Sequence, residues 1–146
     1  MLAVTHRQHM LFSSAVRLLL IINGLYDITC ACAILFVSAT ARNSFIFSSI
    51  HLNVFAHESI KNHPVVRRLL AYWILTYGVA RLSAGVHRGF SIAALTYFVE
   101  AACYHYESTA GGTMIQPKAL FVSLSSIVLG ALVISQHATD SACFCA

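Results

Sequence analysis

The sequence is short of charge. Nine of its 146 residues are Lys or Arg and five are Asp or Glu, so charged residues make up 10% of the chain. Soluble globular domains average about 25%, and this deficit is too large for a surface that faces water. Since 58% of the residues are hydrophobic and the mean hydropathy is +0.75, we expect the chain to bury its apolar surface mainly in lipid.

Sequence motifs of catalysis and metal binding are also missing. The chain has no Gly-rich phosphate loop, no nucleophile elbow and no Glu-x-x-His pair of the di-iron type. Its Cys-x-Cys pairs, which begin at Cys30 and Cys143, lack the second pair of a zinc site. We therefore predict a protein that is not an enzyme, with no catalytic residue, no metal and no cofactor other than bound lipids.

A basic stripe of the kind that binds nucleic acid is absent as well. The formal net charge is +4 and the pI is about 9.0, but the cations occur singly or in pairs at the ends of apolar runs. That distribution suits lipid headgroups and argues against a nucleic-acid partner. The residues expected to contact headgroups are Arg17, Arg67, Arg68, Arg88 and Lys118.

Four apolar segments are long enough to cross a bilayer, which takes roughly 20 helical residues. They predict an all-α integral membrane four-helix bundle that forms one transmembrane domain over residues 1–146, with both termini on one side. No cleavage site precedes a short apolar core, so the first span is expected to be a retained anchor. The predicted spans cover about residues 16–38, 65–85, 90–106 and 119–135.

The segments between the spans are more polar. Residues 1–15 predict an amphipathic lead-in, and residues 39–43 a turn. Residues 44–55 are apolar but too short to cross, which predicts a short interfacial helix between spans one and two. Residues 57–63 predict a loop, while the short turn at 83–89 should make spans two and three an antiparallel hairpin.

The segment from Pro64 to Arg81 is predicted to be the packing centre of the bundle. Trp73, Tyr77 and Arg81 recur every four residues, so two large aromatics and a cation share one helix face. A surface that faces lipid has no use for that arrangement. We therefore expect this face to contact another helix.

Asp27, Arg81 and Glu100 fall inside predicted spans, where an unpaired charge costs about 2.5–3.5 kcal/mol on insertion scales. The helical rise places them within side-chain reach of one another, so Arg81 is expected to pair with Asp27, with Glu100 or with both. Asn23 lies on the same helix face as Asp27. The favoured interpretation is an ion-pair staple that fixes helix packing; a proton or substrate relay and pairing with another subunit are the alternatives.

The spacing of Arg68, Trp73 and Arg81 resembles the second span of the Erg28-like family of small four-span endoplasmic reticulum proteins. The segment from Tyr104 to Glu107 is loosely similar to a His-aromatic patch of that family, and the resemblance covers about residues 64–108. Members of the family scaffold the enzymes of sterol C-4 demethylation. The resemblance implies non-enzymatic tethering of membrane enzymes.

These observations predict a structural or accessory subunit, or a scaffold, of a larger assembly in an intracellular membrane. Its partners would be other membrane protein subunits and lipids, in a respiratory, photosynthetic, sterol-enzyme or viral-membrane complex. The alternative is a small transporter or channel that uses Asp27, Arg81 and Glu100. An enzyme acting on lipids has the least support, since His105 with Glu107 is its one candidate pair.

Overall fold

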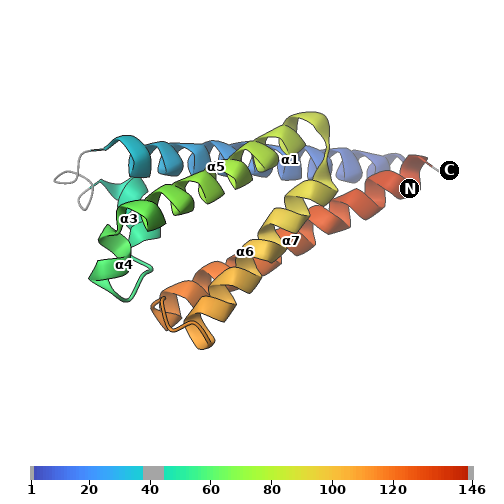
Figure 1. The fold of residues 1–146 in the computed structure, drawn as a ribbon. Coiled ribbons are helices and arrows are strands. Elements are labelled where there is room, and N and C mark those ends of the chain that lie inside the picture. Colours follow the sequence, from blue (N-terminus) through green and yellow to red (C-terminus); the bar gives the residue numbers. More distant parts are fainter. Residues whose placement is uncertain (1, 38–44, 145–146) are drawn as a thin grey trace.

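The computed structural model describes residues 2–37 and 45–144, and the side chains of residues 11–37 and 45–139 among them. Apart from one isolated bridge between Phe55 and Met114, the regular structure of these residues is helical. The helices are α1 (Leu2–Phe36), α3 (Ile46–Leu52), α4 (Glu58–Asn62), α5 (Pro64–His87), α6 (Phe90–Thr109) and α7 (Gln116–Phe144) (Figure 1).

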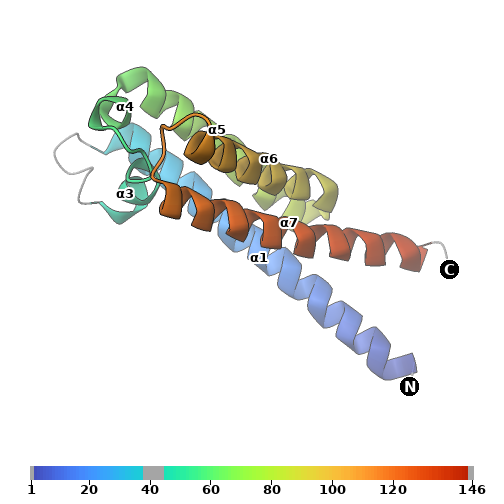
Figure 2. The same ribbon diagram turned by 90° about the horizontal axis from the view of Figure 1, so that it is seen from below.

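The long helices pack as two antiparallel pairs. Helix α1 packs along α5, and α6 packs along α7. Figure 1 shows the pairs close together where α5 turns into α6 and diverging toward the end that carries α3 and α4. Helices α1 and α7 extend past the α5–α6 turn, and Figure 2 shows both chain termini at that same end of the molecule.

Buried residues recur on each long helix at alternating intervals of three and four. This spacing keeps one seam of a helix facing its partner and is typical of helices that pack at about 20° with interlocking side chains. The buried positions that follow this spacing are residues 20, 24, 27, 31 and 34 of α1, 71, 74, 78, 81 and 85 of α5, 90, 94, 97, 101 and 104 of α6, and 119, 123, 126, 130 and 133 of α7.

Glycines bring α1 and α5 into backbone contact. A Cβ atom added to Gly24 would lie 2.6 Å from the backbone nitrogen of Leu82 and 2.7 Å from the carbonyl oxygen of Gly78. A Cβ atom on Gly85 would lie 2.9 Å from the carbonyl oxygen of Arg17. Small residues at such positions let helices approach closely, which increases van der Waals contact where no hydrophobic effect drives association.

Two arginines link the ends of this helix pair. Arg17 Nε donates a hydrogen bond to the carbonyl of Gly85 at 2.9 Å, near the C-terminus of α5. Arg67 Nη2 donates to the carbonyl of Ile34 at 3.3 Å, near the C-terminus of α1. The last carbonyls of a helix lack partners within the helix and carry its partial negative charge. Each helix therefore supplies a cation to the C-terminal end of the other.

A short backbone pairing joins the two helix pairs at the end of the molecule that carries α3 and α4. Ala56 N–H donates to the carbonyl of Thr113 at 2.9 Å, and Ile115 N–H donates to the carbonyl of Val54 at 2.8 Å. These two hydrogen bonds hold the segment that follows α3 against the loop between α6 and α7. Buried Val54, Met114 and Tyr104 pack together beside them.

One local prediction was wrong. Residues 57–63 contain helix α4 rather than only a loop, because the Glu58 carboxylate in its first turn accepts hydrogen bonds from Lys61 at 3.2 Å and Asn62 at 3.1 Å. Helix α1 is continuous from Leu2, so the predicted lead-in and the first span form one helix. The predicted turn at 39–43 lies outside the described residues.

Among the described helices, three are long and apolar enough to cross a membrane: α1 over Leu11–Phe36, α5, and α7 over Gln116–Thr139. They confirm a membrane protein with transmembrane helices. Helix α6 is not among the three; its most polar residues are Glu100, His105 and Glu107. A fourth crossing by α6 and an interfacial position for α3 stay predictions.

Candidate functional site

The centre of the molecule holds a buried ion network built around Arg81. Arg81 on α5 is 2% exposed and Asp27 on α1 is 4% exposed. Arg81 Nη1 lies 2.7 Å from Asp27 Oδ2, and Arg81 Nη2 lies 2.7 Å from Glu100 Oε2 on α6. A single guanidinium thus bonds two carboxylates from two other helices.

Hydroxyl groups complete the network. Arg81 Nε donates to Thr96 Oγ1 at 3.1 Å, and Thr96 donates in turn to the carbonyl of Ala93 at 2.8 Å. Ser126 Oγ on α7 donates to Glu100 Oε2 at 2.9 Å. The network therefore includes a side chain from each of the four long helices. Because buried charges are costly unless they are paired and hydrogen-bonded, these hydroxyls stabilise it.

Aromatic rings enclose the guanidinium. Arg81 Cζ lies 3.9 Å from the centroid of the Tyr97 ring and 5.4 Å from that of Tyr77, within the range of cation–π attraction. The Tyr77 ring contacts Trp73 edge-on, with centroids 5.5 Å apart. Asn23 Nδ2 donates a hydrogen bond to the Tyr97 hydroxyl, so Asn23 joins the network through this ring.

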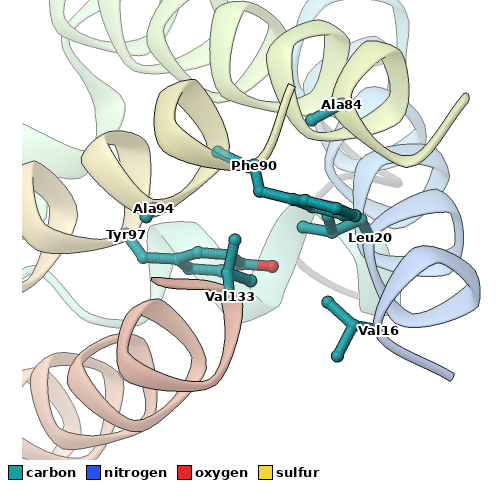
Figure 3. Packing of buried hydrophobic residues seen from close by; sticks show 8 residues of the cluster. Val16, Leu20, Ala84, Phe90, Ala94, Tyr97 and Val133 are labelled. Atoms are coloured by element: carbon teal, nitrogen blue, oxygen red, sulfur yellow. The ribbon is translucent and has the colours of Figure 1, made fainter. Parts of the chain in front are cut away.

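Tyr97 also belongs to an apolar cluster that separates the network from the end carrying the α5–α6 turn. Figure 3 shows side chains from four helices converging there, with the Phe90 ring beside Leu20 and the Tyr97 ring beside Val133. The members of this cluster are 5% exposed or less, so it leaves little room for water on that side. They are Val16, Leu20, Ala84, Phe90, Ala93, Ala94, Tyr97 and Val133.

The structure brings together the six residues predicted for intramembrane pairing and packing. Asp27, Arg81 and Glu100 form the ion network, while Asn23, Trp73 and Tyr77 contact its aromatic shell. Thr96 and Ser126 were missed. Ser125 bonds its own helix backbone through the Phe121 carbonyl, whereas its neighbour Ser126 bonds Glu100.

Four of the five predicted headgroup cations donate hydrogen bonds to backbone carbonyls in this structure. Arg17 and Arg67 bond to the ends of partner helices, as described above. Lys118 Nζ donates to the carbonyl of Asn53 at 2.9 Å, and Arg68 Nε to that of Pro64 at 3.3 Å. Arg88 is exposed at the α5–α6 turn, where its φ of 62° is left-handed. Contact of these five residues with lipid stays a prediction.

His51 on α3 is a half-buried residue whose ring nitrogen Nε2 is enclosed by the protein. Its ring lies 6.1 Å from that of Tyr26 between centroids, and its Nε2 atom is buried with no hydrogen-bond partner among the described residues. Burial lowers the pKa of His51, because removal from water disfavours the charged imidazolium. His51 is therefore neutral at pH 7.

The structure does not bring the candidate enzyme pair into one site. Glu107 accepts a hydrogen bond from Thr113 and lines a pocket with Trp73, whereas His105 lines a different pocket between α6 and α7. No group of three or more His, Cys, Asp or Glu side chains with metal-binding geometry occurs in the described part of the chain.

Comparison of the chain with protein-family models, with curated proteins and with solved structures found no match.

Proposed function

We propose that the protein is a non-catalytic multi-pass membrane protein that serves as a structural or accessory subunit, or a scaffold, of a larger assembly in an intracellular membrane. The observation that carries the proposal is that the charged side chains within the long helices point toward other helices of the same chain. Asp27 and Glu100 each bond to Arg81 between the helices, so the three residues stabilise one packing arrangement. The outer surface is left for apolar contacts with lipids and other subunits.

Large apolar side chains on the outer faces of all four long helices support this role. Lipid-facing and subunit-facing surfaces of membrane helices are both apolar, and an exposed apolar patch on a protein commonly marks a contact surface. The residues more than half exposed include Leu11, Leu18, Ile22, Leu25 and Phe36 on α1, Leu69, Tyr72 and Val79 on α5, Ile92, Leu95 and Tyr106 on α6, and Phe121, Leu124 and Val128 on α7.

The proposal includes four membrane crossings. The polar residues that lower the hydropathy of α6 do not all face outward: Thr96 is 8% exposed and Glu100 is bonded to Arg81 and Ser126. Paired in this way, they no longer oppose burial of the helix in lipid. Helix α3 would then lie at the membrane boundary, beside the α6–α7 loop. The resemblance to the Erg28-like family makes a sterol-enzyme assembly one of the candidate complexes.

Purification from native membranes tests this proposal. The tagged protein would be extracted in a gentle detergent, sized on a native gel, and its companions identified by mass spectrometry. We expect a stoichiometric complex much larger than the 15.9 kDa chain. Phe121→Ser, which changes the most exposed part of α7, serves as a surface variant, and Arg88→Gln at the polar turn serves as its control. Recovery of a monomer or a small homo-oligomer would contradict the proposal.

The buried charges also favour a second candidate, a small transporter or channel. Under this alternative, Asp27, Arg81 and Glu100 would line an ion path, and Asp27→Asn would change the conductance of liposomes that contain the pure protein. The low exposure of Asp27 and Arg81 favours the scaffold. Absence of any conductance in wild-type liposomes would eliminate the transporter.

A further inference from the structure

We propose that the ion network binds one proton, held by the paired carboxyl groups of Asp27 and Glu100, at neutral pH. The network is thus a proton-binding site inside the helix bundle. Its role in helix packing alone does not require proton binding. The inference depends on the burial and charge of the network and not on the proposed scaffold role, so the two can fail separately.

The charges of the network do not balance when all its groups are ionised. Arg81 keeps its proton in proteins and contributes one positive charge. Asp27 and Glu100 both bond to it, at 2.7 Å each, and would contribute two negative charges. The side chains of Arg81, Asp27 and Glu100 are 3%, 6% and 15% exposed, respectively. A net charge in such a place is costly, and a buried ionisable group escapes that cost by taking up a proton.

The described part of the chain offers no second cation to the network. Five of the other cations bond elsewhere, and Arg88 is exposed at the α5–α6 turn. The five are Arg17, Lys61, Arg67, Arg68 and Lys118. A proton from water is therefore the smallest cation that restores the balance.

The remaining titratable groups near the network do not supply a positive charge either. They are Tyr26 and Cys30 on α1, His51 on α3, Tyr77 on α5, and Tyr97, Cys103 and Tyr104 on α6. Tyrosine and cysteine are neutral when protonated. His51 could become a cation, but its burial keeps the imidazole neutral at pH 7. Helix α7 contributes the Ser126 hydroxyl to the network.

The geometry also indicates where the proton resides and how it exchanges. Asp27 Oδ2 and Glu100 Oε2 are the atoms that accept the hydrogen bonds from Arg81, so the added proton forms its O–H bond at the other oxygen of either carboxyl group. Glu100 is the more exposed of the two acids. Exchange of the proton with water therefore runs through Glu100.

Infrared spectroscopy of the purified protein at pH 7.5 tests the proposal, because a protonated carboxyl group has a carbonyl stretch distinct from that of a carboxylate. We expect a band equivalent to one carboxylic acid per chain, which shifts in D₂O. Both Asp27→Asn and Glu100→Gln should abolish it, since the acid that remains balances Arg81. Glu107→Gln and Glu58→Gln serve as matched controls and should leave the band unchanged.

Three results would overturn the inference. The first is a wild-type spectrum without the band, a result that needs no variant to fold. The second is loss of the band in only one of the two network variants, which would indicate an ordinary isolated acid. The third is loss of the band in Glu107→Gln. Circular dichroism and gel filtration establish that each variant compared retains its helices and its size.

Discussion

At the scale of single residues, Arg81 is the centre of the buried ion network. Its three guanidinium nitrogens bond to Asp27, Glu100 and Thr96, and its face contacts the Tyr97 ring. A planar fork of donors can make these contacts together, whereas the ammonium of lysine is a single point charge. Lysine at position 81 would therefore keep the positive charge but could not make all three of these hydrogen bonds in the same geometry.

Removal of Arg81 should strongly destabilise the protein. Arg81→Leu leaves two carboxyl groups buried without their cation, and breaking a buried ion pair costs about 3–5 kcal/mol. The triple variant R81L/D27N/E100Q should recover most of this loss, because no charge is left unpaired. Unfolding in detergent by heat or denaturant measures both. The exposed Arg88→Leu is the control, and an Arg81→Leu protein as stable as the control would contradict the staple.

His51 should make stability depend on pH. Its folded-state pKa is lowered by burial, so the unfolded chain binds more protons once the pH falls below the ordinary histidine value of about 6.5. We expect the free energy of unfolding to decline between pH 7.5 and pH 5.5. His51→Phe, which keeps a ring beside Tyr26, should show a smaller decline than wild type, measured by thermal unfolding at each pH.

Comparison with His57→Phe separates this effect from the other groups that titrate. His57 is exposed, so His57→Phe is the control for loss of an imidazole at the surface. Equal slopes in wild type and His51→Phe would show that the imidazole is not buried in the folded protein.

Sequence reasoning reached the charged members of the network but not its hydroxyls. Asp27, Arg81 and Glu100 stand out because an intramembrane charge demands a partner, and their depths along the helices allow them to meet. Thr96 and Ser126 carry no such signal, since hydroxyl side chains in membrane helices usually bond their own backbone. Only the positions of α6 and α7 distinguish Ser126 from its neighbour Ser125.

At the scale of helices, α1 and α5 approach closely because glycines, which have no side chain, lie at their contact. Gly24 and Gly78 face each other, and Gly85 faces the backbone of α1 near Arg17. These positions share the spacing of buried residues that all four long helices follow. Gly78 and Gly85, two helical turns apart on α5, are thus the pattern in the sequence that indicates a close helix contact.

Gly24→Ala should destabilise the α1–α5 pair. The added Cβ would lie 2.6 Å from a backbone atom of α5, so the helices must separate, and such overpacking typically costs about 1–3 kcal/mol. Gly89→Ala is the matched control, because its nearest neighbour is 3.8 Å away and its φ is −77°. Thermal unfolding of the two variants compares them directly. Equal stability would refute the close approach of the helices.

The limits of the helices were harder to predict than their existence. Apolar length located the three helices that can cross a membrane, since about 20 apolar residues leave few alternatives. Helix α4 was missed because its five residues are too short for a periodic pattern, and one carboxylate with its two partners stabilises it. The amphipathic lead-in at residues 1–15 is continuous with the first span in α1, a continuity that the change from polar to apolar residues did not predict.

At the scale of the whole molecule, the arrangement is two helix pairs rather than an even bundle. The short turn at Arg88 and Gly89 predicts that α5 and α6 are neighbours, and they are. Nevertheless, α5 packs chiefly on α1 and α6 on α7. The short loop at residues 110–115 accounts for the α6–α7 pair. Chain order does not reveal the α1–α5 pair, because its close contact comes from glycines on two helices that are far apart in sequence.

The membrane topology can be tested by cysteine labelling from either side of the membrane. With the native cysteines replaced, Ser59→Cys on α4 and Ala110→Cys after α6 should react from one side, and Arg88→Cys at the α5–α6 turn from the other. All three positions are exposed. If α6 does not cross, Ala110→Cys will react from the same side as Arg88→Cys, and the four-crossing arrangement will be wrong.

The order of the charges along the chain has a consequence for biosynthesis. A chain is made and inserted from its N-terminus, so the ribosome delivers Asp27 first, then Arg81 and last Glu100. The α1–α5 pair can therefore enter the membrane with the charges of Asp27 and Arg81 already paired. Glu100 arrives with α6 at a cation that already has a partner. The first two long helices can thus await the last two without an unpaired charge between them, and under the inference above the arrival of Glu100 is accompanied by the uptake of one proton.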